Sequence, residues 1–402
     1  MSLTSKYGKW KTRLFIGILF FLCLFETSQL LARSDVKEPS AQPRGYFDYK
    51  GVIHWHTDYS KDCTGTYEQA AAIGNRQQVD FMIATEHNSL QALADGKEGW
   101  HANTLILTGV EITRPGEKHN SYLLGLDLKH YANTRADSTG KVVSDIAAQG
   151  GLALIAHPRN PRWSWTGPID PRIAGMEILD MTDQWYTVSP GAFLQGLMKY
   201  PFDRLAAYLQ LYSRPEKTLK AWDLITRDRD FVGVYAPDFH QSILLPGGGR
   251  LRFPRVRDVL PIAHDHIISK TPFSGKLARD KAMLYDAIRR GHLYVAIDMV
   301  QDATGFLFSA TQGKKSAWMG DRLPAGRDTS FSIHLPEHPG LKNVVTRVYH
   351  DGEEIFTSSD DVSRFQARLP GAYRVEVETE VSGFMGLGKK LVWIYSNPIY
   401  LR

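Results

Sequence analysis

The sequence predicts an α/β fold up to about residue 300 and a small antiparallel β fold after it. Short apolar segments alternate with helical segments from Tyr46 onward, which is typical of strands joined by crossover helices. After about residue 300 the segments are short, often alternate apolar with polar residues, and are separated by Pro-Gly and Asp-Gly turns. A chain of 402 residues has room for both parts.

The individual elements are predicted from these apolar runs and from their Gly and Pro boundaries. The strands expected before residue 300 are Gly51–Trp55, Asp80–Thr85, Thr104–Gly109, Ser121–Leu126, Leu152–Ala156, Phe231–Ala236 and His292–Ile297. The helices expected there are Tyr67–Gln78, Lys141–Gln149, Phe193–Tyr212, Glu216–Arg227 and Arg279–Arg290. The strands expected later are Thr329–Leu335, Asn343–His350, Arg364–Leu369, Ala372–Val377 and Leu391–Tyr395. These elements predict an α/β domain over residues 46–300 and a sandwich-like β domain over residues 301–402.

The first 32 residues have the pattern of a secretory signal. A basic stretch from Lys6 to Arg13 precedes the apolar run Leu14–Phe25, and Ala32 offers a small residue for cleavage. Because Leu30 is a poor residue for a cleavage site, an uncleaved membrane anchor is the alternative. Residues 33–45 then form a polar linker. We therefore expect a secreted or periplasmic protein, or one anchored through this apolar run.

The charge and cysteine content exclude several classes of protein. The formal net charge is +5, but the charged residues of the leader supply +3 of it, so a nucleic-acid partner is not expected. Only two cysteines are present, which excludes disulfide scaffolds, zinc fingers and iron–sulfur centres. A bound metal would need nitrogen and oxygen ligands, and the chain has 14 histidines.

Histidines and carboxylates recur at the ends of the predicted strands. His54 and His56 project from the same face of an extended chain, so both can reach one metal. Similar residues stand at the ends of four further strands: His87, Glu111, His157, and the pair Asp238 and His240. His119 precedes a strand instead. Because active-site residues of α/β folds gather at the carboxyl ends of their strands, the pattern predicts one metal site.

The ordered motifs resemble those of the PHP (polymerase and histidinol phosphatase) superfamily. They are H-x-H-T (54–57), E-H-N (86–88), G-V-E-I-T (109–113), A-H-P (156–158) and D-x-H (238–240). The stretch from Leu277 to Asp298 and the later PGAYRVEVE and SNPIYL resemble the CehA/McbA-type metallohydrolases of that superfamily. The resemblance implies a distorted (β/α)7 barrel that holds two or three divalent metal ions, with zinc, manganese or iron as candidates.

The resemblance also implies a role for each ligand. His54, His56 and Asp238 would bind one ion, and Glu111 would bridge to a second ion held by His119 and His157. His87 and His240 would complete the set. Asp62 is favoured over Asp58 as the acidic ligand that follows the H-x-H-T motif. Glu86 is interpreted as a partner that orients an imidazole.

A hydrolytic mechanism follows from the chemistry of paired metals. Two ions lower the pKa of a bridging water, polarise the substrate oxygen and stabilise the charge that develops on it. No nucleophilic Ser or Cys is then required, so Cys63 is not assigned a catalytic role. Asp62 and His240 are the candidate catalytic residues for moving the proton.

The sequence points to a small-molecule substrate and leaves its class open. Arg159 and Arg162 follow His157 and are candidates for gripping a phosphate, or they belong to a solvated basic loop. Nearby aromatic residues would form a substrate wall or pack in the core: Trp163, Trp165, Trp185 and Tyr186. His264 and His266 are interpreted as non-ligands. The leading hypothesis is a phosphoesterase, the alternative is an ester, amide or carbamate hydrolase, and a third is a non-catalytic metal-binding protein without an obligate protein partner.

Overall fold

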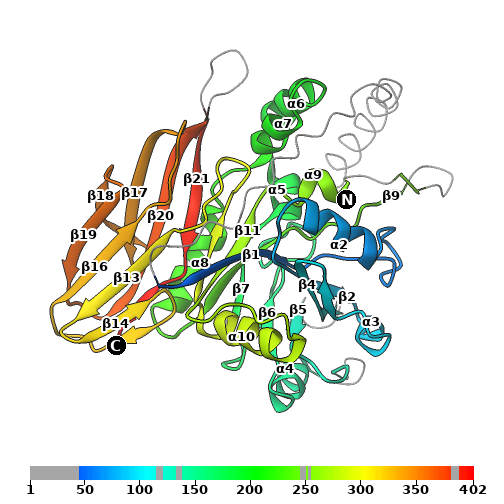
Figure 1. The fold of residues 1–402 in the computed structure, drawn as a ribbon, viewed down its shortest axis with the longest axis horizontal. Helices are drawn as coiled ribbons and strands as arrows, with labels where there is room; N and C mark the ends of the chain where they lie inside the picture. The colour runs from blue at the N-terminus through cyan, green and yellow to red at the C-terminus, as the bar shows by residue number, and fades with distance from the viewer. Residues whose placement is uncertain (1–44, 115–120, 133–137, 245–249, 252–254, 382–388) are drawn as a thin grey trace.

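The computed structural model describes residues 45–114, 121–132, 138–244, 250–251, 255–381 and 389–402. An α/β region and a β region lie side by side in it (Figure 1). The predicted leader, almost all of the predicted linker, and His119 lie outside the described residues. Within the described ranges, no helix is long and apolar enough to cross a membrane.

The α/β region is built on a mixed sheet with few helices. Its strands are β1 (Phe47–Ile53), β2 (Phe81–His87), β3 (Gly99–His101), β4 (Thr104–Arg114), β5 (Ser121–Leu126), β6 (Leu152–Ile155), β7 (Gly175–Asp180), β8 (Val232–Ala236), β9 (Ile243–Leu244), β10 (Arg250–Leu251), β11 (His264–Ser269) and β12 (Leu293–Ala296). Its helices are α2 (Tyr67–Arg76), α3 (Gln91–Ala94), α4 (Thr139–Ala148), α5 (Met181–Thr187), α6 (Pro190–Lys199), α7 (Arg204–Leu211), α8 (Glu216–Thr226), α9 (Val256–Val259) and α10 (Leu277–Arg290). The strand β7 is not among the strands expected from the sequence.

The strand directions depart from a regular (β/α)7 barrel. The neighbours run in the order β12-β11-β1-β2-β4-β5-β6-β7-β8. Pairing is parallel from β1 through β4 and from β6 through β8, but β4–β5, β5–β6 and β1–β11 are antiparallel. The short connection between β4 and β5 accounts for their antiparallel pairing, because a parallel return needs a crossover. Strands β5 and β6 pair antiparallel although helix α4 lies between them in the chain.

Side chains and loops link the last strand, β8, back to the first strands. Asp265 on β11 accepts a hydrogen bond from Tyr235 N at 2.8 Å. Asn397, from the β region, exchanges two hydrogen bonds with the backbone of Gly233, at 2.8 and 2.9 Å. At the carboxyl ends, Asp238 N donates to His54 O at 3.0 Å. The chain segments that follow β1 and β8 are thereby held next to each other.

One long helix predicted over Phe193–Tyr212 is wrong, because the segment forms two helices, α6 and α7. Pro201 follows the end of α6 and cannot donate a backbone hydrogen bond within a helix. Each helix then has its own N-cap: Ser189 Oγ accepts from Ala192 N at 3.2 Å, and Asp203 Oδ1 accepts from Ala206 N at 2.9 Å. The two caps and the proline together define a helical hairpin.

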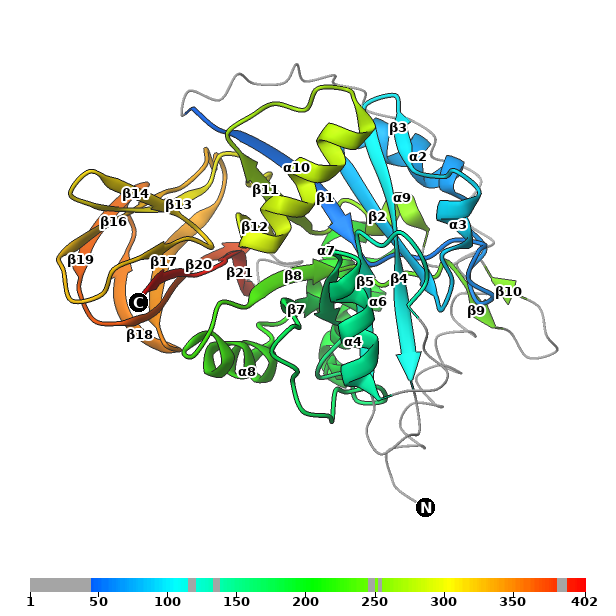
Figure 2. The same ribbon diagram turned by 90° about the horizontal axis from the view of Figure 1, so that it is seen from below.

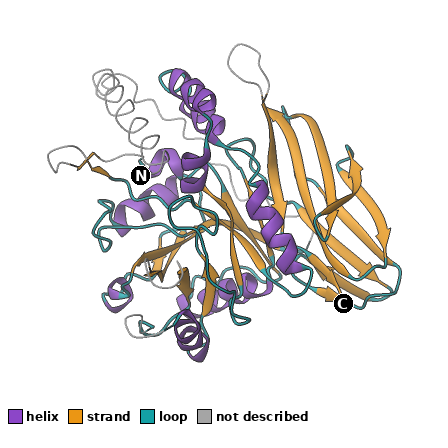
Figure 3. Ribbon diagram, turned by 180° about the vertical axis from the view of Figure 1, so that it is seen from behind, coloured by secondary structure: helices purple, strands orange, loops and turns teal. Residues whose placement is uncertain are grey.

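The β region places two sheets face to face across an apolar core (Figure 3). Its strands are β13 (Leu307–Gln312), β14 (Lys315–Trp318), β15 (Arg322–Leu323), β16 (Thr329–His334), β17 (Lys342–His350), β18 (Glu353–Ser358), β19 (Val362–Ala367), β20 (Gly371–Val381), β21 (Lys389–Ser396) and β22 (Ile399–Leu401). Strands β14-β13-β16-β19 form one sheet. The alternating burial along β16 places Phe331 in the core, where its ring centroid lies 4.9 Å from that of Tyr373 on the facing sheet.

The second sheet of the β region continues the sheet of the α/β region. Strand β12 pairs antiparallel with β21, with Tyr294 opposite Ser396 and Ala296 opposite Ile394. Figure 2 shows β12 and β21 meeting where the two regions join. The two predicted domains therefore share one backbone hydrogen-bond ladder.

A buried ion pair also joins the two regions. Arg374 on β20 donates from Nε and Nη2 to the two carboxylate oxygens of Asp223 on α8, at 2.6 and 2.8 Å. Its Nη1 donates to Glu376 at 2.5 Å. Nearby, Gly320 has a φ of +90°, and a Cβ there would lie 1.9 Å from the carbonyl oxygen of Arg290. Only glycine allows this approach of the β region to the end of α10.

Candidate metal centre

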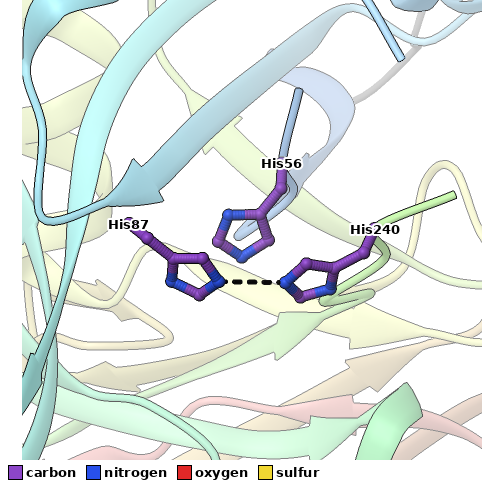
Figure 4. A group of neighbouring side chains, drawn as sticks. All are labelled: His56, His87 and His240. Atoms are coloured by element: carbon purple, nitrogen blue, oxygen red, sulfur yellow. Dashed lines mark hydrogen bonds between the residues drawn. The ribbon is translucent and has the colours of Figure 1, made fainter. Parts of the chain in front are cut away.

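The candidate ligands that the structure describes meet at one end of the α/β sheet. They stand in or just after strands: His54 and His56 (β1), His87 (β2), Glu111 (β4), His157 (β6), and Asp238 and His240 (β8). This is the gathering that the strand-end pattern predicts. Figure 4 shows three of them, His56, His87 and His240, pointing toward one another from three separate segments.

Three of these residues have a left-handed backbone conformation, which residues other than glycine rarely adopt. The φ angles are +73° at His54, +30° at His157 and +40° at Asp238. Such a conformation costs on the order of 1–3 kcal/mol and persists only where surrounding contacts enforce it. Each of the three residues directly follows a strand, or lies two residues beyond it, so the strain accompanies the turn that brings its side chain into the centre.

Four buried atoms of the kind that ligate metals face one another and make no hydrogen bond among themselves. They are His54 Nε2, His56 Nε2, Glu111 Oε2 and Asp238 Oδ1. Each imidazole nitrogen lies 3.5 Å from the Glu111 oxygen, and the distances to the Asp238 oxygen are 3.3 Å from His54 and 3.4 Å from His56. Donors around a tetrahedral ion with bonds of about 2.0–2.1 Å lie about 3.3–3.4 Å apart. The spacing and the missing hydrogen bonds both fit a divalent metal.

Glu111 presents its two oxygens to different histidines. Oε1 lies 3.0 Å from Nε2 of His157, and Oε2 lies 2.8 Å from Nδ1 of His87. A carboxylate in this position can contact two ions at once. The two Glu111 oxygens are thus directed toward histidines that follow different strands.

A third group lies closer to solvent. Nε2 of His87 and Nε2 of His240 are 3.1 Å apart, and Asp62 Oδ2 lies 3.3 Å from the first and 3.6 Å from the second. The Asp62 side chain is 53% exposed. Asp58 instead lines a separate cavity with Glu68 and Lys97. Of the two acidic candidates left open by the sequence, Asp62 is the one beside the histidines.

Glu177 belongs to the centre and was not found from the sequence. Its Oε1 lies 2.5 Å from Nδ1 of His54, and its Oε2 accepts a hydrogen bond from the backbone N–H of His157. A carboxylate on Nδ1 fixes the imidazole tautomer and leaves the Nε2 lone pair for a metal. The only signal in the sequence is that Glu177 interrupts the apolar residues of β7, G-M-E-I-L-D.

Glu86 contacts the centre through hydroxyl groups. Its carboxylate accepts hydrogen bonds from the hydroxyls of Thr57 and Ser60, both at 2.6 Å, and from Thr57 N at 3.1 Å. Ser60 Oγ in turn lies 3.2 Å from His56 Nδ1. Glu86 is thus linked to His56 through Ser60, in a position to orient that imidazole without binding a metal itself.

The centre concentrates negative charge in a buried place. Burial alone lowers the pKa of an imidazole, yet contacts with Glu111 raise the pKa of His157 to about 9. Contacts with Asp62 and Glu111 likewise outweigh burial at His87 and raise its pKa to about 10. The same histidines hold the pKa of Glu111 well below its usual range, although burial opposes this. Such a site requires cations, either as protons on the imidazoles or as metal ions.

Two of the predicted substrate-binding groups lie near the centre in different settings. The Arg162 guanidinium stands 5.3 Å from the ring centre of Tyr186 and 5.9 Å from that of Trp163. The Trp163 ring is 6.1 Å from that of His157. Arg159 is exposed to solvent. Trp165 donates to Gly167 O, and Trp185 packs against Phe193 of α6.

His264, His266 and Cys63 make contacts unlike those of the candidate metal ligands. His264 Nδ1 and His266 Nε2 lie 2.7 and 2.9 Å from Asp298 Oδ2, and His266 Nδ1 lies 2.9 Å from Asp48. These are hydrogen-bond distances, shorter than the 3.3–3.5 Å that separates the histidine nitrogens from the carboxylate oxygens in the set formed by His54, His56, Glu111 and Asp238, called the four-donor set. The Cys63 thiol is buried, 3.1 Å from His56 O, and burial raises its pKa to about 12.

Solved structures similar to this chain include two phosphoesterase-like proteins and an amidohydrolase. A two-domain protein from Bacteroides vulgatus, which contains a predicted PHP-like metal-dependent phosphoesterase, is 14% identical, with a TM-score of 0.40 over 90% of this chain and 100% of that chain. A protein from Bifidobacterium adolescentis proposed to be a metal-dependent phosphoesterase is 13% identical, with a TM-score of 0.31 over 55% and 96%. An amidohydrolase from Chromobacterium violaceum with bound sulfate and no metal is 14% identical, with a TM-score of 0.28 over 51% and 92%. No protein-family model and no curated protein matches the chain.

Proposed function

We propose that this protein is a metal-dependent hydrolase and that phosphate esters are its substrates. The observation that carries the proposal is the set of four buried donor atoms around His54 and Glu111 that face one another without hydrogen bonds. Burying such groups is costly unless a partner compensates them. A divalent ion is the partner that their chemistry and spacing suit.

The described residues suggest how two or three ions would be held. His54, His56 and Asp238 would hold the first with Glu111, as their mutual distances of 3.3–3.5 Å indicate. Glu111 Oε1 and His157 would contribute to the second, and we propose that His119 joins them. Asp62, His87 and His240 would hold a third ion. Mixed imidazole and carboxylate ligands suit zinc, manganese or iron.

Bound ions would supply Lewis-acid polarisation of the substrate and a water activated near neutral pH. The protein's own groups would do the rest. Glu177 orients the His54 ring, and Glu86 does the same for His56 through Ser60. Asp62 and His240 stand at the solvent-facing side of the centre, and with only two ions bound they would be free to pass a proton toward a leaving group.

The wall beside His157 supports a phosphate ester with an aromatic group. Trp163 and Tyr186 offer ring faces, and the Arg162 guanidinium between them can pair with a phosphate oxygen. The same aromatic faces suit an aryl ester, amide or carbamate, which is therefore the second candidate. The Arg162 guanidinium is the feature that favours a phosphate ester over the ester, amide and carbamate substrates.

The test is metal analysis of the purified protein, followed by parallel assays on aryl phosphate mono- and diesters and aryl carbamates. We expect at least two ions per chain and phosphate-ester turnover that is lost on chelation and restored by metal. Glu111→Gln and His54→Ala should each lower kcat/KM by about 100-fold or more, because each removes a ligand. The matched controls Glu353→Gln and His130→Ala alter exposed residues away from the centre and should leave it unchanged.

Each alternative has its own outcome in this test. Turnover that persists after complete metal removal would exclude a metallohydrolase. Turnover of aryl carbamates but not of phosphates, lost in the same variants, would establish the second candidate. Stoichiometric metal with no hydrolysis of any substrate would favour the non-catalytic metal-binding protein.

We also propose that the leader directs the chain out of the cytoplasm. Its basic stretch and the apolar run Leu14–Phe25 support export, either with cleavage near Ala32 or as an anchor. The N-terminal residue of the protein recovered from the producing cell, and its release from membranes by high salt, would distinguish the two forms.

A further inference from the structure

A cavity of about 590 Å³ lies at the end of the α/β sheet opposite to the metal centre. It is bordered by the residues that enter β7 and β8, whereas the metal ligands follow the other ends of these strands. Strands of five or six residues separate the two places by roughly 15–20 Å. The end of α10 and the β14–β15 turn of the β region complete the rim, so both regions of the protein contribute to the cavity.

Five arginines line this cavity: Arg172, Arg229, Arg289, Arg290 and Arg322. Two carboxylates line it as well, and both are engaged. Asp230 accepts from Arg322 Nε at 2.5 Å, and Asp321 accepts from Trp318 N at 2.8 Å and lies 2.9 Å from His292 Nε2. The lining therefore carries an excess of positive charge.

Two of the five arginines have no carboxylate within ion-pair distance among the described residues. Arg289 donates from Nη2 to the carbonyl oxygen of Gly150 at 2.8 Å. Arg229 donates from Nη1 to the carbonyl oxygen of Pro171 at 2.6 Å, and its guanidinium lies 4.7 Å from the ring centre of Phe231. By contrast, Arg172 and Arg290 pair with Asp170 and Asp286 at 2.7 and 2.9 Å.

Arg229 is the unusual member of the group. Its Nη2 is buried and makes no hydrogen bond. Burial lowers the pKa of its guanidinium, and the nearby charge of Asp170 offsets this only in part. A half-buried cation that has no carboxylate at ion-pair distance destabilises the protein, and a bound anion would reduce that cost.

We propose that this cavity is a binding site for a small molecule bearing phosphate groups, separate from the metal centre. Guanidinium groups from four segments of the chain line the cavity, and their forked N–H donors match the geometry of phosphate oxygens. The volume lies within the usual range for small-molecule sites, so the ligand would be larger than a single inorganic ion. This inference does not depend on the proposed hydrolase function, because no metal ligand lines the cavity.

Binding would be measured with inorganic pyrophosphate as the probe, by calorimetric titration of the full protein at fixed ionic strength. The double variant Arg229→Met and Arg289→Met should weaken binding at least about tenfold, because it removes the two guanidinium groups that lack counter-ions. Arg279→Met, an exposed arginine on the same helix as Arg289, is the matched control and should not change it. Arg289→Met alone alters an exposed side chain and should leave the fold intact. If the double variant fails to fold, weaker pyrophosphate binding by this single variant tests the proposal instead.

Glu111→Gln separates this site from the metal centre. The proposal is supported if Glu111→Gln leaves the affinity for pyrophosphate unchanged and the arginine variants lose it. Affinity lost in Glu111→Gln but retained in the arginine variants would place the probe at the metal centre and overturn it. Absence of binding by the unaltered protein up to about 10 mM would overturn it as well.

Discussion

Glu177 Oε1 lies 2.5 Å from Nδ1 of His54, so a carboxylate on β7 sets the orientation of an imidazole that follows β1. The same carboxylate accepts from the backbone N–H of His157. One side chain thus holds two residues with left-handed backbone conformations that stand at the ends of different strands.

Replacing this carboxylate should weaken metal binding without removing a metal ligand of the four-donor set. In Glu177→Gln the amide can accept from only one of its two partners through oxygen, so either His54 or the turn at His157 loses its support. We expect metal affinity to fall about 10–100-fold, as measured by competition with a chelating dye. Glu353→Gln is the matched control, and an affinity within twofold of the unaltered protein in Glu177→Gln would contradict the assigned role.

The ion pair between Arg374 and Asp223 should contribute to the stability of the contact between the two regions. Arg374→Met leaves the buried Asp223 carboxylate without its counter-ion, which costs about 3–5 kcal/mol. The free energy of unfolding from urea titration measures this loss. Arg364→Met, on the exposed face of β19, should change it by less than about 0.5 kcal/mol. A change below about 1 kcal/mol in Arg374→Met would show that the pair is dispensable.

Cys63 should be unreactive in the folded protein. Burial raises the pKa of its thiol to about 12, and only the thiolate is nucleophilic. Iodoacetamide at pH 8 should therefore modify Cys63 slowly in the native state and rapidly in urea, as mass spectrometry of its peptide would report. Rapid native labelling would contradict the burial of this side chain, whereas Cys63→Ala should retain activity.

Asp80 should make stability fall as the pH rises from about 4 to 6. Burial raises its pKa to about 6, although a hydrogen bond from Lys50 N at 2.9 Å opposes the shift. Because the folded state then holds a proton that the unfolded state releases near pH 4, the stabilising effect is complete below pH 4 and lost as the pH passes 6. As the pH rises between these values, the free energy of unfolding of Asp80→Asn should therefore increase by up to about 3 kcal/mol relative to that of the unaltered protein. A difference in unfolding free energy that does not vary with pH would refute this.

The strand-end pattern in the sequence predicted which residues meet, because ligands such as His87 and Asp238 follow apolar runs that are easily recognised. Glu177 could not be predicted in this way, since it lies inside an apolar run and its role depends on a partner 123 residues away. The two-helix hairpin was missed because the apolar periodicity of Phe193–Tyr212 outweighed the break at Pro201. Long-range pairing, such as that between β12 and β21, has no local signal at all.

The pairing of β12 with β21 has a consequence for any attempt to isolate the α/β region. Ending the chain at residue 300 would strip the partner from β12 and leave its backbone donors and acceptors at a newly exposed sheet edge. Uncovered apolar edges of this kind recruit strands from other molecules. Truncation is therefore expected to give aggregates, because the β region supplies the strand that covers the β12 edge of the α/β sheet.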